Sequence, residues 1–99
     1  MSVFIFMQGQ IPMIEAIIKE LPNSFDSHQF IQKFARRFEV EYVWYLSQYD
    51  KEPFRKVNMQ IGRFLSENKD LLKIKDMGEW DSPNVFGDLT KNEYWQKCN

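Results

Sequence analysis

Residues 53–68 read PFRKVNMQIGRFLSEN, and they decide the fold more clearly than any other stretch of the chain. At 100° per residue the apolar side chains fall within a sector of about 100°; they are Phe54, Val57, Ile61, Phe64 and Leu65. The opposite face is polar and mostly basic. Proline suits the first turn of a helix, where its missing N–H has no partner to lose. The sequence therefore predicts an amphipathic helix from about Pro53 to Asn68.

Two further helices are predicted upstream of this one. Pro12 opens a stretch whose apolar residues recur at helical spacing as far as Leu21, and Pro22 then stops it. Asp26 followed three residues later by Gln29 is typical of a capping box, in which each side chain bonds the other residue's backbone N–H. We therefore expect a second helix to begin just after Asp26.

Residues 39–49 fit either a helix or a strand. Val40, Tyr42, Trp44 and Leu46 alternate as in a strand, whereas aromatic and apolar residues also recur at helical spacing. We favour a helix, because the flanking segments are helical and neither glycine nor an Asn-Gly turn is present to close a hairpin. A strand here would make the fold mixed α+β.

The last third of the chain differs in character from the helical part. Residues 71–75 predict the start of a strand, Met77 and Gly78 break it, and residues 80–84 are typical of a turn. A second short apolar segment follows at Val85 and Phe86. We therefore expect a small β-ribbon with a long tip over residues 71–95.

The organisation predicted for the 99 residues is a single domain without internal repeats or a linker. Residues 1–10 form an apolar arm or strand, residues 11–68 the helices and residues 71–95 the ribbon. Four consecutive apolar residues, Val3 to Phe6, need cover on both faces. That cover comes from the same chain or from a second copy, and we expect a homodimer.

This mainly α arrangement with a small C-terminal β-ribbon resembles the winged helix-turn-helix superfamily. The resemblance rests on the helix–turn–helix span of residues 39–68 and on the wing-like span of residues 71–95. It is architectural and includes no family-specific motif. It implies a transcription regulator in which the helix before the wing enters the major groove of duplex DNA.

The residue types on the polar face of residues 53–68 suit such a role. Arginine can bridge two acceptors of guanine, glutamine can do so on the adenine edge, and lysine holds phosphates. Residues 51–75 hold seven basic and three acidic side chains. The candidate DNA-binding residues are Arg55, Lys56, Met59, Gln60, Arg63, Lys73 and Lys75. A charged face opposite an apolar stripe is also common on any surface helix, and that interpretation stays open.

A protein partner is the alternative. Residues 76–99 carry five acidic and two basic side chains, which favours a basic partner. Glu79, Trp80 and Asp81 are the candidate contacts of such an adaptor or inhibitor. We expect Trp44 in the core, while Trp80 lies either in the core or exposed at an interface.

Several functions have little support in the sequence. His28 and Cys98, the only residues of their types, are too few and too far apart for a metal site, and we expect neither a cofactor nor enzyme activity. The apolar runs are too short to span a bilayer, so we expect no membrane association. A single cysteine allows no internal disulfide, and cytoplasmic is the location expected by default.

Overall fold

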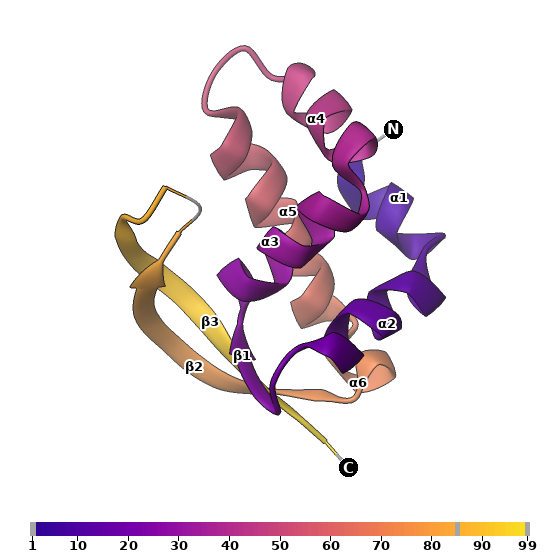
Figure 1. Ribbon diagram of the computed structural model, residues 1–99, viewed down its shortest axis with the longest axis vertical. Helices are drawn as coiled ribbons and strands as arrows, with labels where there is room; N and C mark the ends of the chain where they lie inside the picture. The colour runs from indigo at the N-terminus through magenta and orange to yellow at the C-terminus, as the bar shows by residue number, and fades with distance from the viewer. Residues whose placement is uncertain (1, 85, 99) are drawn as a thin grey trace.

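The computed structural model describes residues 2–84 and 86–98, and it shows a mainly helical fold with a three-stranded antiparallel sheet (Figure 1). The sequence prediction of a helical domain with a C-terminal ribbon is confirmed. The helices are α1 (Val3–Gln8), α2 (Ile11–Glu20), α3 (Ser27–Arg37), α4 (Glu39–Ser47), α5 (Pro53–Glu67) and α6 (Lys69–Leu72). The strands are β1 (Ser24–Asp26), β2 (Ile74–Pro83) and β3 (Leu89–Lys97).

The N-terminal segment is a helix, so the prediction of an arm or strand is wrong. Ser2 caps α1 by accepting a hydrogen bond from the Ile5 backbone N–H, and Val3 and Met7, one turn apart, are both buried. Rings on neighbouring faces contact different helices, Phe4 lying 5.4 Å from Phe64 of α5 and Phe6 lying 5.2 Å from Phe38. A helix spreads consecutive apolar residues around its axis, and much of the cover comes from the same chain.

The predicted capping box at the start of α3 is confirmed. Asp26 Oδ1 accepts from the Gln29 N–H at 2.8 Å, and Gln29 Oε1 accepts from the Asp26 N–H at 2.9 Å. The sequence did not predict strand β1, which precedes the cap and pairs with β3. Three residues are too few for a periodic pattern, and their partners lie about 70 positions away in the chain.

Residues 39–47 form helix α4, as favoured from the sequence, but Trp44 is 50% exposed and its predicted place in the core is wrong. α4 buries Tyr42 and Tyr45, which lie three positions apart, and Trp44 lies outside that stripe. The Tyr42 hydroxyl donates to Asn58 Oδ1 of α5 at 2.6 Å, which fixes α4 on α5. α5 buries Val57, Ile61, Phe64 and Leu65, as its periodicity predicts.

Strand β2 starts later and ends later than predicted. Residues 69–72 form helix α6, and Lys73 has a left-handed backbone with φ of 56°, so the strand begins at Ile74. Met77 and Gly78 do not end it, because they form a β-bulge at which Gly78 has φ of 95°. The strand then continues to Pro83, so residues 80–83 are not a turn. Val85, in the second apolar segment of the predicted ribbon, lies outside the described residues.

The sheet connects the helical body to a curved hairpin formed by β2 and β3. The strand order is β1-β3-β2, which makes β3 central. Trp95 of β3 pairs with Phe25 and Asp76, is fully buried, and donates from Nε1 to Ser27 Oγ at 2.9 Å. Beyond this point the hairpin curls toward the N-terminal end of α5 (Figure 1).

Candidate functional site

The exposed face of α5 carries five of the predicted DNA-binding residues, and Met59, near its middle, is 62% exposed. Arg55 and Arg63 lie two turns apart along the helix and are both largely exposed. Arg55 forms an ion pair of 3.2 Å with Glu52, and Arg63 one of 3.2 Å with Glu67. Exposed pairs of this kind contribute at most about 1 kcal/mol, so both guanidinium groups can exchange partners.

Lys56 and Gln60 are more constrained than Arg55. Gln60 Nε2 donates to the Tyr49 hydroxyl at 2.8 Å, and the Lys56 ammonium lies 5.6 Å from the centre of the same ring. Arg63 also lies over the Phe4 ring at 4.5 Å. Tyr49 and Phe4 thus hold three of the five predicted DNA-binding side chains on α5 against the helical body.

Lys73 and Lys75 lie at the opposite end of α5 from Arg55. Lys73 follows α6, and Lys75 is exposed near the start of β2. α5 spans 15 residues, or about 22 Å. Arg55 lies in its first turn, and α6 follows its last turn. The predicted DNA-binding set therefore extends along the helix from one end to the other.

Glu79, Trp80 and Asp81 lie along strand β2 and not at the hairpin tip. Successive strand residues point to opposite faces, so Trp80 is separated from the two carboxylates. Glu79 is opposite Glu93 and Asp81 is opposite Lys91 in the ladder. Trp80 is 62% exposed, and its ring lies 5.9 Å from that of Tyr94. Asp76, Glu79 and Asp81 are therefore all in β2, away from the hairpin tip.

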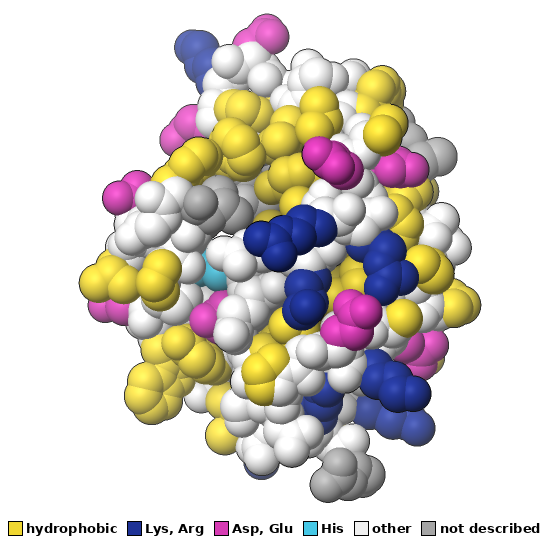
Figure 2. Space-filling view, viewed as in Figure 1, with side chains coloured by type: hydrophobic (Ala, Val, Ile, Leu, Met, Phe, Trp, Pro, Cys, Tyr) yellow, Lys and Arg dark blue, Asp and Glu magenta, His cyan; other side chains and the backbone are white. Residues whose placement is uncertain are grey.

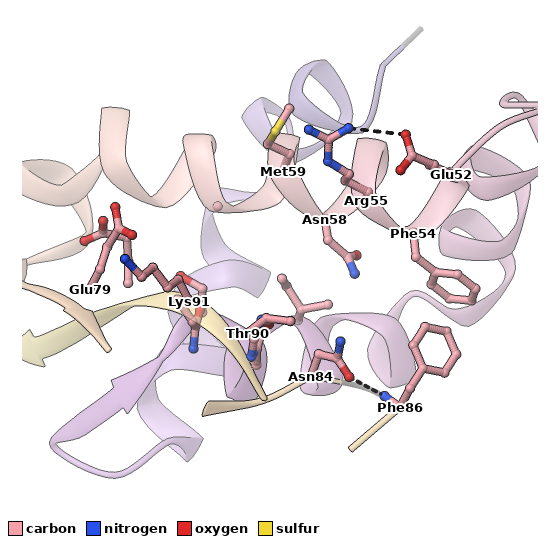
Figure 3. Close-up of a pocket in the computed structure, with 16 residues that line it drawn as sticks. Glu52, Phe54, Arg55, Asn58, Met59, Glu79, Asn84, Phe86, Thr90 and Lys91 are labelled. Carbon is pink, nitrogen blue, oxygen red and sulfur yellow. Dashed lines mark hydrogen bonds and ion pairs between the residues drawn. The ribbon is translucent and has the colours of Figure 1, made fainter. Parts of the chain in front are cut away.

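A groove of about 790 Å³ separates the first half of α5 from the hairpin, and Figure 2 shows the hollow with basic side chains beside it. At one end the rings of Phe54 and Phe86 meet edge to face at 4.9 Å. At the other end are Glu79 and Lys91, as the close-up shows (Figure 3). The groove therefore has an aromatic end and a charged end.

A polar network under the groove fixes the hairpin to α3. His28 Nδ1 lies 3.0 Å from Ser82 Oγ, and His28 Nε2 lies 3.4 Å from Thr90 Oγ1. Asn92 Nδ2 donates to the same Ser82 Oγ at 2.8 Å, and both of these side chains are buried. The network joins β2, β3 and the first turn of α3.

Three carboxyl groups gather where the hairpin faces α5. The hydrogen bond with Asp76 raises the pKa of Glu93 to about 7, and desolvation and the nearby charges of Asp76 and Glu79 act in the same direction. The pKa of Asp76 is lowered, chiefly by that hydrogen bond and by one from the Gly78 N–H. Protonated Glu93 therefore donates a hydrogen bond to Asp76, and the raised pKa of Glu93 means that this proton is lost near neutral pH.

Gly62 of α5 lies opposite Glu93 and lines both the groove and a neighbouring cavity of about 380 Å³. A Cβ added at Gly62 would meet nothing within 4 Å, so the glycine leaves open space and is not required by a close contact. Glu93 Oε2 and Gln60 Oε1 are buried beside this space, and neither oxygen has a hydrogen-bond partner among residues 2–84 and 86–98.

Sequence reasoning missed the groove, and in particular Phe54, Phe86 and Glu93. Phe54 belongs to the apolar face predicted for residues 53–68, yet it is partly exposed. The groove is lined by residues of α3, α5, β2 and β3, which are up to about 65 positions apart in the chain. Only the register of the hairpin, which the sequence did not predict, brings Glu93 opposite Gly62.

Known proteins provide no further identification. A scan against protein-family models, a search of curated proteins and a search of solved structures each found no match. Among residues 2–84 and 86–98, no helix is long and apolar enough to cross a membrane. The same residues contain no group of three or more His, Cys, Asp or Glu side chains suited to holding a metal ion.

Proposed function

We propose that this protein is a regulator that binds duplex DNA through the exposed face of α5, in the manner of a winged helix-turn-helix domain. The order of elements supports it, with two helices, α4 and α5, followed by a hairpin whose strand β3 pairs with β1. The observation that carries the proposal is the pair of exposed guanidinium groups on α5, Arg55 and Arg63, beside that hairpin.

The chemistry of α5 fits duplex DNA. A helix of about 22 Å can lie in the major groove, where arginine reads guanine and contacts phosphates. Phosphate would replace Glu52 and Glu67 as the partner of each arginine. Met59, between the two arginines, can contact the methyl group of thymine.

The acidic residues of the hairpin lie mostly away from its tip. The described part of the tip comprises Asn84, Phe86, Gly87 and Asp88, so it carries one carboxylate. Glu79 and Asp81 lie further down β2, away from the tip. Repulsion of phosphates at the tip is therefore weaker than the local charge of residues 76–99 implies.

Titration of fluorescent random-sequence duplex DNA at low and moderate salt tests the proposal. We expect binding at low salt, with a log–log salt slope that falls by ~0.9 in the Arg55→Gln variant, because this variant neutralises one phosphate fewer. Lys19→Gln on α2 removes the same charge elsewhere and should leave the slope unchanged. Absence of binding at low salt, or an equal effect of both variants, would refute the role of α5.

A protein partner on the hairpin is the second candidate function, favoured by its exposed apolar side chains, which are Met77, Trp80, Phe86 and Leu89. Soluble monomers rarely expose several such residues together without using them. A pull-down should recover less partner with the Trp80→Ala, Glu79→Lys double variant. Trp44→Ala, which removes a tryptophan that is 50% exposed on α4 against 62% for Trp80, is the control. Equal recovery with both variants would exclude the hairpin as the interface.

A further inference from the structure

Helix α4 has two apolar faces, of which the fold buries only one. Tyr42 and Tyr45 pack on the body, whereas Val40 is 80% exposed, Val43 is 58% exposed and Trp44 is half exposed. At 100° per residue the three exposed side chains fall within a sector of about 100°, on the opposite side of the helix from the two tyrosines. We call these three residues the outer stripe of α4.

The outer stripe lies at one end of the molecule and is turned away from α5. Tyr42, on the opposite face of α4, donates to Asn58 of α5, and α4 is at the periphery of the fold (Figure 1). Figure 2 shows apolar side chains gathered over this end of the molecule. Adjacent exposed apolar residues of this kind usually mark an interaction surface. A molecule bound to the stripe would leave the exposed face of α5 free.

We propose that two copies of this chain associate through the outer stripe, with α4 of one copy packed antiparallel on α4 of the other around a two-fold axis. The association goes beyond DNA binding and does not depend on it. It also moves the contact expected between copies from the N-terminal segment to α4. Val3 and Met7 of α1 are buried by their own chain, and Phe4 and Phe6 pack on its rings.

The outer stripe is complementary to a second copy of itself. A two-fold interface joins the same patch on both copies, so large side chains must meet small ones. In an antiparallel pair, the Trp44 ring of one copy can lie against Val40 of the other, and the two copies of Val43 meet near the axis. The stripe carries no charge, so its pairing with a second copy buries no unpaired ion.

The charges at the two ends of α4 favour the antiparallel arrangement. Glu39 and Glu41 lie in the first turn, and exposed Lys51 follows the C-terminal end. Antiparallel packing brings the acidic turn of each copy toward Lys51 of the other, and it opposes the two helix dipoles. A parallel pair would instead bring four carboxylates together. The formal net charge of the chain is −1, so two copies repel each other little at long range.

The size of the stripe determines how tightly the copies associate. α4 has nine residues and is about 13 Å long. Stable complexes commonly bury about 800 Å² on each partner, and two helices of this length bury less. We therefore expect a reversible dimer with a dissociation constant in the high micromolar range.

Sedimentation equilibrium of the full chain from about 10 µM to about 1 mM tests the proposal, because dimerisation follows mass action. The average mass should rise from monomer toward dimer. Val43→Glu places two carboxylates at the axis and should raise the dissociation constant at least tenfold. Trp44→Ala, which removes the largest ring, should act in the same direction. Trp80→Ala on the hairpin and Leu71→Glu on α6 also change exposed apolar residues and should leave dimerisation unchanged. Equal melting temperatures of these variants at low concentration would confirm that folding is unaffected.

Disulfide cross-linking tests the position of the axis. In a Cys98→Ser background, Val43→Cys should give a disulfide-linked dimer under mild oxidation, because the bond requires a Cα separation of about 4.4–6.8 Å. Leu71→Cys is the matched control and should cross-link far more slowly. A chain that stays monomeric up to about 1 mM would overturn the proposal and leave the stripe to a different protein. A dimer that persists in both Val43→Glu and Trp44→Ala, or one that Trp80→Ala dissociates, would overturn it as well.

Discussion

The helical body and the hairpin are built on opposite principles. Rings without solvent exposure, such as Phe30, Phe34 and Phe64, hold the body together. The outer part of the hairpin has mostly exposed side chains, and it is held by the Ser82 network and the Phe54–Phe86 contact. Segments with few buried apolar contacts open at low free energy, whereas cores open only with global unfolding. The body therefore holds α5 in place, while the hairpin that faces it opens at lower free energy.

Strand β3 belongs to both the helical body and the hairpin. Trp95, near its C-terminal end, lies in the core with β1 and β2 on either side. Lys91 and Glu93, earlier in the same strand, line the groove. A change at Trp95 would disturb the body, while a change four residues away would affect the site. This separation allows the two regions to be tested one at a time.

The largest expected difference between the regions is between two phenylalanines. Phe34→Ala should lower the free energy of unfolding by about 3–5 kcal/mol, because Phe34 is fully buried and packs on the rings of Phe30, Phe38 and Tyr42. Phe86→Ala should change it by about 0.5 kcal/mol or less, since this ring is exposed. Urea denaturation followed by circular dichroism measures both. Comparable losses would show that the hairpin tip is part of the cooperative core.

The junction between the regions should show an intermediate effect. Ser82→Ala leaves buried Asn92 Nδ2 without its acceptor and frees His28 Nδ1, which costs about 1–3 kcal/mol. We expect this loss to appear as faster amide hydrogen exchange in β2 and β3, with exchange in α5 little changed. Ser66→Ala on the exposed side of α5 is the matched control. Faster exchange throughout the helices would mean that hairpin and body open together.

Features fixed by neighbours in the chain were predicted from the sequence. The capping box at Asp26 and Gln29 and the apolar stripe of α5 depend on residues within a few turns, and both are present. Trp44 was assigned wrongly because helix α4 carries apolar residues on more than one face, and only its packing on α5 decides which are buried. Pairing of β1 with β3, and hence the position of Glu93 opposite Gly62, depends on contacts between distant segments.

The smallest expected effect concerns the pH dependence of the site itself. Glu93 has a pKa of about 7 in the folded chain and 4.5 as an ordinary glutamate, so between these values the folded state binds more protons than the unfolded state. The contribution of Glu93 to stability is therefore present below pH 4.5 and is lost as the pH rises to 7. The lowered pKa of Asp76 acts in the opposite direction, but only below its ordinary value of 3.8.

Between pH 5 and pH 8 the Glu93 effect should therefore dominate the carboxyl cluster. Glu93→Gln removes the titrating proton, so the variant should gain on the wild type in melting temperature as the pH rises, by on the order of 3 °C. Melting curves of wild type, Glu93→Gln and the control Glu15→Gln at the two pH values measure this. If Glu93→Gln and wild type differ equally at pH 5 and pH 8, the cluster does not titrate in this range. The hairpin would then face α5 with a charge that stays fixed between pH 5 and pH 8.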